Sequence, residues 1–296
     1  MVARMPSRSG EPDQAEHGEV RAGFDAFYER KWSGHGGFWL DWYPRYMGLY
    51  ADLLRQRNRE ISAALPNGLG RALDCGCGAG DVSAILIDRA RAVVAVDVAI
   101  ANLYQTRRNL RDQVAVVCAG AEDLPFASEQ FDAVVLADVI EHIPRNKEAM
   151  VEIARVLRPG GLLVIATPDR QVLETIEAID RVAARGVRGL RSFVRRAMGR
   201  PGIGAHAPSD EAWEEFLTRQ ELADLVRGVG LTIREHRNIC FYPGPEGGGV
   251  FAMMLATIGR FDRFRERLME PALRPLFAAI ARLERFNQKQ LLVAVK

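Results

Sequence analysis

Short apolar runs alternate with helix-like segments through the middle of the chain. From Arg71 onward, the runs RALDC, AVVAVD, VAVVC, FDAVVLAD and GLLVIAT are rich in β-branched and small apolar residues. Continuous apolar runs of this length, separated by helices, are typical of a parallel sheet that is covered on both faces. The chain closes with another such run, LLVAVK. The pattern therefore predicts an α/β fold.

The segments around this core have a different pattern of polar and apolar residues. Residues 1–20 are polar and predict a mobile tail, whereas residues 21–68 are rich in aromatics before they become helix-like, which predicts a helical N-terminal cap. Residues 69–296 then form the main domain. Two amphipathic segments interrupt its α/β pattern, at about 170–210 and 242–288, and we expect both to be helical insertions.

A helix start is marked between these two insertions. Thr218 is followed three residues later by Glu221, which is the spacing of a capping box, and the segment ELADLVRGVG continues the helical pattern. A strand is expected to follow around residues 231–240. The α/β alternation therefore resumes after the first insertion.

Composition and charge narrow the class of protein. The chain has 296 residues, of which 48% are hydrophobic and 26% charged, and a net charge of +2. A chain of this size buries a large core without disulfides, and 40 basic against 38 acidic residues disfavour a dedicated DNA-binding protein. Four cysteines and the lack of a long apolar run or a signal-peptide core predict a cytoplasmic protein.

The most informative segment is LDCGCGAGD at residues 73–81, which follows a predicted strand and opens a helix. Its glycines do not have the G-x-G-x-x-G spacing of dinucleotide-binding proteins. Asp74 precedes the first glycine, where a carboxylate would repel a pyrophosphate but would suit an ammonium group. Asp97 ends the next strand, where an acidic side chain can bind both hydroxyls of a ribose. Together these features indicate a ligand that joins a nucleoside to an amino acid.

Five segments in this order resemble the class I S-adenosylmethionine-dependent methyltransferases: LDCGCGAG, VVAVDVA, GAEDLPF, FDAVVLADVIEHI and VLRPGGLLVIATP, within residues 70–168. The resemblance implies a Rossmann-like methyltransferase fold with a mostly parallel seven-stranded sheet and helices on both faces. It also implies S-adenosyl-L-methionine as cofactor and S-adenosyl-L-homocysteine as product. A Rossmann-like core that binds nothing and a nicotinamide oxidoreductase remain the alternatives.

The resemblance assigns cofactor-binding residues by position. It places Gly76, Cys77 and Gly78 against the methionine part, near Asp74. In the third motif Gly120 stands where many relatives carry an acidic residue that contacts the adenine. The remaining positions are Asp97 at the ribose, Val98 beside the adenine, Ala121 and Glu122 as substitutes for the missing acidic contact, and Ala137 and Asp138 near the reactive methyl group.

The segment DVIEH and the spacing from His206 to Glu221 are most similar to the ubiquinone-biosynthesis O-methyltransferases. This similarity implies a small, apolar acceptor with a hydroxyl group and makes His142 the candidate catalytic base, although a hydrogen-bonded structural histidine explains it equally well. In that group an acidic cluster followed by Glu-His is linked to a divalent cation. Asp138, Glu141 and His142 would form such a site, or would cap a helix and orient a loop, and we assign them no metal.

The sequence alone does not decide between several further ligands and partners. Arg45 is either a ligand of the cofactor carboxylate or a surface residue. The arginine-rich segment at 181–200 fits a solvated helix face, a peripheral contact with an anionic membrane surface, or an RNA contact. The alternatives to an O-methyltransferase are an enzyme that methylates nitrogen or carbon, an enzyme that methylates protein or RNA, and a non-enzymatic cofactor-binding protein. The sequence does not indicate an oligomeric state.

Overall fold

A computed structural model of the chain describes three stretches, residues 48–175, 214–240 and 287–296. The helix that precedes the sheet, α3 (Gly48–Ala64), covers only the end of the predicted cap. The following predictions fall on residues outside these stretches: the tail, most of the cap, most of both insertions, Arg45, His206 and the arginine-rich segment 181–200.

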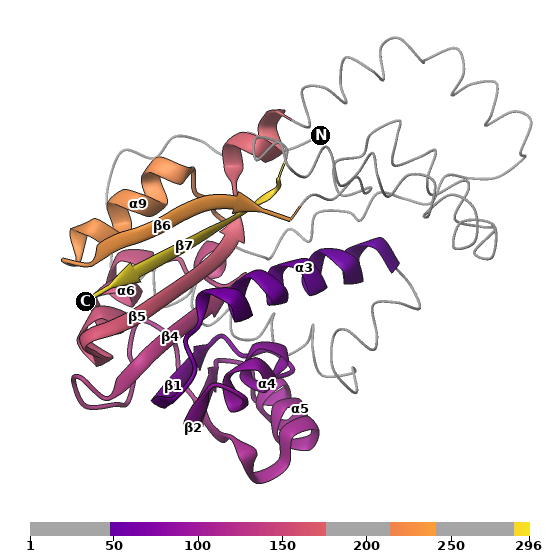
Figure 1. The fold of residues 1–296 in the computed structure, drawn as a ribbon, viewed down its shortest axis with the longest axis vertical. Coiled ribbons are helices and arrows are strands. Elements are labelled where there is room, and N and C mark those ends of the chain that lie inside the picture. The colour runs from indigo at the N-terminus through magenta and orange to yellow at the C-terminus, as the bar shows by residue number, and fades with distance from the viewer. Residues whose placement is uncertain (1–47, 176–213, 241–286) are drawn as a thin grey trace, which may run out of the picture.

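Seven strands form one sheet in the order β3-β2-β1-β4-β5-β7-β6 (Figure 1). β1 to β5 pair in parallel, and β7 is antiparallel to both of its neighbours. The predicted mostly parallel, seven-stranded sheet is confirmed. The strands are β1 (Leu69–Cys75), β2 (Ala90–Asp97), β3 (Ala115–Cys118), β4 (Phe131–Ala137), β5 (Leu157–Pro168), β6 (Thr232–Ile239) and β7 (Lys289–Val295).

Helices cover both faces of this sheet, as predicted. Alternate residues of a strand point to opposite faces, and Val134 and Leu136 of β4 belong to one buried cluster with side chains of α6 and α9. Ala133 and Val135 belong to a second cluster with side chains of α3 and α4. The helices other than α3 are α4 (Asp81–Ile87), α5 (Ile100–Leu110), α6 (Asn146–Val156) and α9 (Arg219–Gly228), with short 3-10 turns η1 (Arg111–Gln113) and η2 (Ile140–His142).

The predicted helix start at α9 is also confirmed. The hydroxyl of Thr218 accepts a hydrogen bond from the backbone N–H of Glu221, and the Glu221 carboxylate accepts one from the backbone N–H of Thr218 at 2.8 Å. This reciprocal capping box satisfies two backbone donors that a helix start leaves open. Leu222 and Val226 then point into the core.

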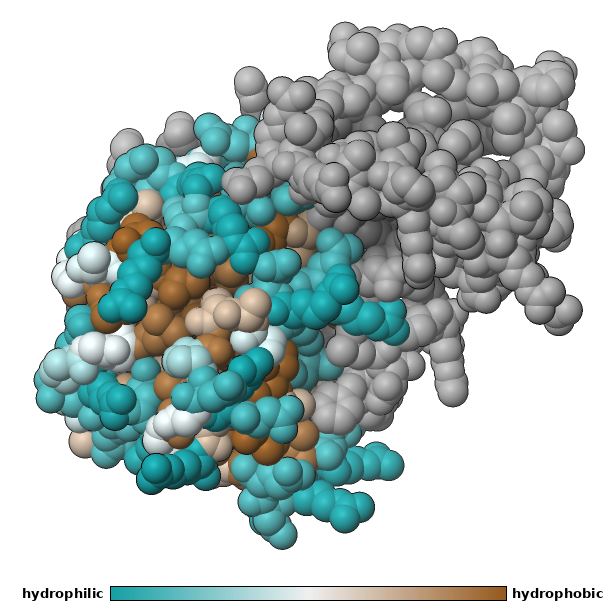
Figure 2. All heavy atoms as spheres, in the orientation of Figure 1, coloured by the Kyte–Doolittle hydropathy of each residue, from teal (hydrophilic) through white to brown (hydrophobic). Residues whose placement is uncertain are grey.

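On the face of the described part seen in Figure 2, hydrophilic and apolar side chains are interspersed. Large hydrophobic side chains that are exposed in the described part include Ile100, Tyr104 and Val151. None of the helices in the described stretches is long and apolar enough to span a membrane.

The topology brings the ends of several elements to one edge of the sheet. The carboxyl ends of parallel strands lie at the same edge, which is where α/β proteins bind their ligands. β7 runs in the opposite direction, so its first residue, Lys289, lies at this edge, opposite Pro168 of β5. The site described below is built at this edge.

Candidate functional site

The glycine-rich loop between β1 and α4 leaves no room for a side chain at Gly76. Gly76 has φ +81°, and a Cβ atom built there would lie 2.4 Å from Cγ2 and 2.7 Å from Cγ1 of Val139. Rotation of the valine about its Cα–Cβ bond would not relieve both contacts. The loop therefore packs directly against the residue that follows Asp138 at the end of β4.

Hydrogen bonds hold this loop in place from two sides. The backbone N–H groups of Gly76 and Cys77 both donate to the carbonyl oxygen of Val96, at 2.7 and 2.9 Å. From α5, the hydroxyl of Thr106 donates to the carbonyl oxygen of Gly78 at 2.9 Å. Contacts from both β2 and α5 therefore fix the shape of the loop.

Asp97 stands at the carboxyl end of β2 and is largely buried. One of its oxygens, Oδ2, accepts a hydrogen bond from the backbone N–H of Gly78 at 2.9 Å. The other, Oδ1, accepts from the backbone N–H of Ala99 at 2.9 Å and from Nδ2 of Asn102 at 3.1 Å. The carboxylate is thus fixed beside the glycine loop, and its role in binding a ribose stays a prediction.

Asp74 lies deeper, at the end of β1. Its side chain is buried, and Oδ2 accepts a hydrogen bond from Oγ of Ser83 in α4 at 2.6 Å. Burial raises the pKa of this carboxyl to about 7, and the serine hydrogen bond opposes the rise only in part. An ammonium group placed nearby would favour the charged form of the carboxyl.

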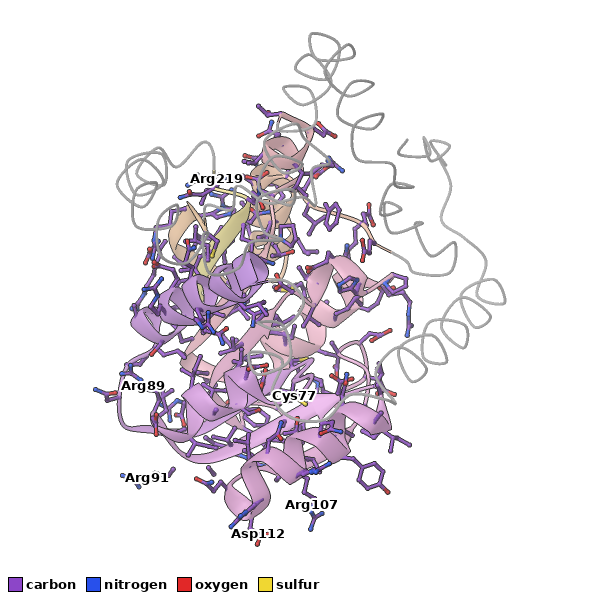
Figure 3. The ribbon with its side chains drawn as sticks, turned by 90° about the vertical axis from the view of Figure 1, so that its right-hand side faces the viewer. Cys77, Arg89, Arg91, Arg107, Asp112 and Arg219 are labelled. Carbon is purple, nitrogen blue, oxygen red and sulfur yellow. The ribbon has the colours of Figure 1, made fainter. Side chains whose placement is uncertain are left out.

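Cys77 lies inside the loop region, whereas Arg107 and Asp112 project from the molecule (Figure 3). Burial raises the pKa of the Cys77 thiol well above its usual value, so the sulfur stays protonated and packs as a small apolar group. Cys75, also buried, has its pKa raised by the same cause. Neither thiol is poised as a thiolate for metal binding.

The predicted adenine-side residues lie near the ends of β2 and β3. Val98 is half-buried, and its carbonyl oxygen accepts a hydrogen bond from Sγ of Cys118 at 3.6 Å. Ala121 is buried in the core. The carboxylate of Glu122 lies 3.6 Å from a guanidinium nitrogen of Arg145. The structure thus engages Glu122 in an ion pair that the sequence did not indicate.

Asp138 follows β4 and is held by two cations. Its backbone has φ +58°, a conformation that is uncommon for a residue other than glycine. Nη1 of Arg57 in α3 donates to Oδ2 at 2.6 Å, and Nζ of Lys289 at the start of β7 donates to Oδ1. Burial raises the pKa of this carboxyl, but the charges of Lys289 and Arg57 outweigh it and lower the pKa to about 2.

Glu141 lies in η2, three residues further along. It is 2% exposed, and its Oε2 accepts a hydrogen bond from Oγ1 of Thr167 in β5 at 2.8 Å. Burial, reinforced by the negative charge of Asp138, raises the pKa of Glu141 to about 8. Together, Arg57, Asp138, Glu141, Thr167 and Lys289 form what we call the counter-ion cluster.

His142 comes next in the sequence and is partly exposed. Its side chain is 21% exposed, and Nδ1 lies 3.9 Å from Oε1 of Glu214. Within the described stretches, no group of three or more His, Cys, Asp and Glu side chains is arranged to hold a metal ion. Asp138, Glu141 and His142 are neighbours in sequence but do not converge on one point.

Sequence reasoning missed three members of the counter-ion cluster: Arg57, Thr167 and Lys289. Arg57 is one of several arginines in a helix, so its position carries no special signal. Lys289 did carry a weak one, because a lysine two residues before the apolar run LLVAV needs a partner once it is buried. The identity of that partner depends on the order of the strands.

Comparisons with known proteins agree with this architecture. A family model described as a methyltransferase domain matches residues 73–165. A ubiquinone biosynthesis O-methyltransferase from Cereibacter sphaeroides is 28% identical over 235 residues, which cover 75% of this chain and 85% of that protein. The corresponding protein of Ruegeria pomeroyi is 29% identical over 243 residues, covering 78% of this chain and 89% of its own length.

A solved structure shows a similar fold over nearly the whole chain. The 1,6-didemethyltoxoflavin-N1-methyltransferase of Burkholderia thailandensis, with bound S-adenosylhomocysteine, aligns with a TM-score of 0.55 and 16% identity. The alignment covers 98% of this chain and 93% of that structure. The sheet order, the matched domain and the relatives together support a class I S-adenosylmethionine-dependent methyltransferase, with a methyltransferase domain at residues 73–165.

Proposed function

We propose that this enzyme transfers the methyl group of S-adenosylmethionine to a hydroxyl of a small, apolar acceptor. The observation that carries the proposal is the extent of the similarity to O-methyltransferases. It covers 75% and 78% of this chain in the two relatives, well beyond the cofactor-binding domain at residues 73–165. A likeness confined to that domain would support only the use of the cofactor.

The glycine loop and the ends of β1 and β2 fit the cofactor. Gly76 leaves no room for a side chain because it packs against Val139, and the backbone of residues 76–78 would face the methionine part. The carboxylate of Asp97, fixed by Gly78, would accept hydrogen bonds from the ribose hydroxyls. Asp74 would attract the ammonium group, and Val98, Ala121 and Glu122 would lie along the adenine.

The cofactor supplies an electrophilic methyl group on a sulfonium. The protein's part is to hold the acceptor oxygen in line with that methyl and to remove the hydroxyl proton. Holding two reactants in near-attack geometry can supply much of the rate acceleration of such a transfer. Ala137 and Asp138, at the end of β4, would border the methyl group.

His142 is the residue we assign to proton removal. Asp138 is too weak a base, because its pKa is about 2. Glu141 is buried, and its carboxyl already accepts the hydrogen bond of Thr167. His142 is partly exposed, carries an imidazole, the side chain that enzymes use most often for proton transfer, and has Glu214 nearby to orient its ring.

The test is product analysis after incubation with methyl-labelled S-adenosylmethionine and matched acceptors: an apolar phenol, the amine of the same skeleton, and fractionated protein and RNA. We expect label on the phenol oxygen. His142→Asn should lower kcat by about 100-fold with little change in KM for the cofactor. Asp97→Ala should instead raise the KM for the cofactor.

His236→Asn is the matched control, because His236 lies on β6, where Nε2 contacts Oε1 of Gln290, and has no part in the proposed transfer. Its rate should stay close to that of the wild type. Label on the amine, or in protein or RNA, would refute the O-methyltransferase assignment. A fully active His142→Asn enzyme would refute the assigned role of that residue alone.

A further inference from the structure

The counter-ion cluster is a set of buried charges at the point where methyl transfer would occur. Arg57 is 7% exposed, Lys289 5% and Glu141 2%. Buried charges are costly unless each is paired and hydrogen-bonded. The arrangement of the four charged or ionisable side chains therefore shows which groups compensate one another.

Each oxygen of Asp138 has its own cation. Arg57 donates to Oδ2 and Lys289 donates to Oδ1. A divalent metal bound to this carboxylate would need the same oxygens. It would also lie next to two positive charges that are themselves buried.

The fold makes this pairing independent of any ligand. The backbone N–H of Asp138 donates to the carbonyl oxygen of Ala166 at 2.8 Å, which fixes the end of β4 against β5. β7 pairs with β5 so that Lys289 lies opposite Pro168. Strand pairing thus positions the ammonium group of Lys289 beside Asp138. The same sheet carries Thr167, the hydrogen-bond partner of Glu141.

We propose that Lys289, together with Arg57, is the resident counter-cation of Asp138, and that it occupies the electrostatic place that a divalent metal would take in this acidic segment. The acidic cluster followed by Glu-His resembles a metal-linked pattern, but the two side chains that complete the site in this chain are cationic. In the folded chain Lys289 holds the carboxylate of Asp138 at the end of β4.

Displacing the two cations from Asp138 would cost free energy. Removing one partner of a buried ion pair leaves the other charge uncompensated, which is strongly unfavourable. A metal that displaced Lys289 and Arg57 from Asp138 would leave two such cations in the core. The inference concerns charge balance alone, so it holds whichever acceptor is methylated.

The first part of the test uses the full-length wild-type protein and Mn²⁺, followed by electron paramagnetic resonance of the free ion. We expect no stoichiometric Mn²⁺ site, and no change in melting temperature between chelator and added Mn²⁺. A wild-type protein that binds one Mn²⁺, and loses it in Asp138→Asn, would overturn the proposal.

The second part uses Lys289→Met and, as matched control, Lys289→Arg. Methionine removes the charge while keeping the length of the side chain, so the acidic pair should become able to bind Mn²⁺. We expect a lower melting temperature for Lys289→Met, which added Mn²⁺ raises again by several degrees. Lys289→Arg should show neither effect, and Lys289→Met with Asp138→Asn should lose the response to Mn²⁺.

A folded Lys289→Met protein that is indifferent to Mn²⁺ would also overturn the proposal, because the lysine would then be a packing residue only. If Lys289→Met does not fold, Mn²⁺ binding by the wild type and by Lys289→Arg tests the proposal. Both proteins must lack an Mn²⁺ site. None of these measurements requires methyl transfer, so their outcome is separate from that of the proposed function.

Discussion

The glycine loop and the counter-ion cluster lie on neighbouring strands but are built in different ways. The loop is held by backbone hydrogen bonds and by side chains from the next two elements, β2 and α5. The cluster joins Asp138 to Arg57, 81 positions away, and to Lys289, 151 positions away. The loop is therefore a local structure that short motifs encode, whereas the cluster exists only once the sheet has assembled.

The largest expected effect concerns a feature that the two regions share. Each contains a buried carboxyl of raised pKa, Asp74 at about 7 and Glu141 at about 8. A carboxyl that holds its proton more tightly in the folded state than in the unfolded chain stabilises the fold at low pH, and this stabilisation is lost as pH rises through the folded-state pKa. Stability should therefore fall from about pH 4, by about 1.4 kcal/mol per pH unit for each such group.

The two carboxyls can be separated by variants. Between pH 7 and 8 Glu141 is the one still titrating, so Glu141→Gln should flatten that part of the curve and leave the lower part to Asp74. Urea unfolding at a series of pH values measures this. Glu148→Gln, an exposed glutamate in the same region, is the control and should follow the wild type. A Glu141→Gln curve parallel to the wild type between pH 7 and 8 would contradict the raised pKa of Glu141.

The contrast between local and assembled structure explains which parts of the fold and the site could be predicted from the sequence. The parallel strands were predictable because apolar runs and their spacing are local, and Asp97 because it ends such a run. The capping box at Thr218 and Glu221 was predictable for the same reason. The antiparallel insertion of β7 between β5 and β6 is a property of the whole sheet, and it alone decides that Lys289 meets Asp138.

A second consequence is that Glu141 and His142, adjacent in the sequence, occupy different environments. Their pattern suggested one cluster with Asp138. In the fold, Glu141 points into the core toward Thr167, whereas His142 is partly exposed beside Glu214. Sequence spacing identified the right segment, but only the packing of η2 against β5 separates the buried acid from the reachable imidazole.

The next prediction tests how rigidly the loop is joined to the end of β4. Gly76→Ala would place a Cβ atom 2.4 Å from Val139 at φ +81°. Gly160→Ala has a similar φ, +75°, and no described atom lies within 4 Å of its Cβ. Both variants bear the conformational cost of about 1 kcal/mol, so Gly76→Ala should lose about 2 kcal/mol more stability than Gly160→Ala because of the clash.

Adding Val139→Ala to Gly76→Ala should restore most of the stability lost to the clash. Chemical unfolding of Gly76→Ala, Gly160→Ala, the double variant and Val139→Ala alone measures this. Affinity for S-adenosylhomocysteine should follow the same order, since the clash displaces the loop backbone. Equal stabilities of Gly76→Ala and Gly160→Ala would mean that Val139 can move aside, and that the loop is not tied to the counter-ion cluster through it.

The smallest effect belongs to the capping box of α9, which is a local motif like the glycine loop. Thr218→Ala removes the acceptor for the N–H of Glu221 and should cost about 1 kcal/mol of unfolding free energy. Thr218→Ser keeps the hydroxyl and should lose only a few tenths. The Glu221 carboxylate also binds Arg170 at 2.6 Å, so part of the helix start survives in either variant. If Thr218→Ala cost as much as Gly76→Ala, the helix start would be coupled to the rest of the sheet edge, and the distinction between locally encoded and assembled structure would not hold at α9.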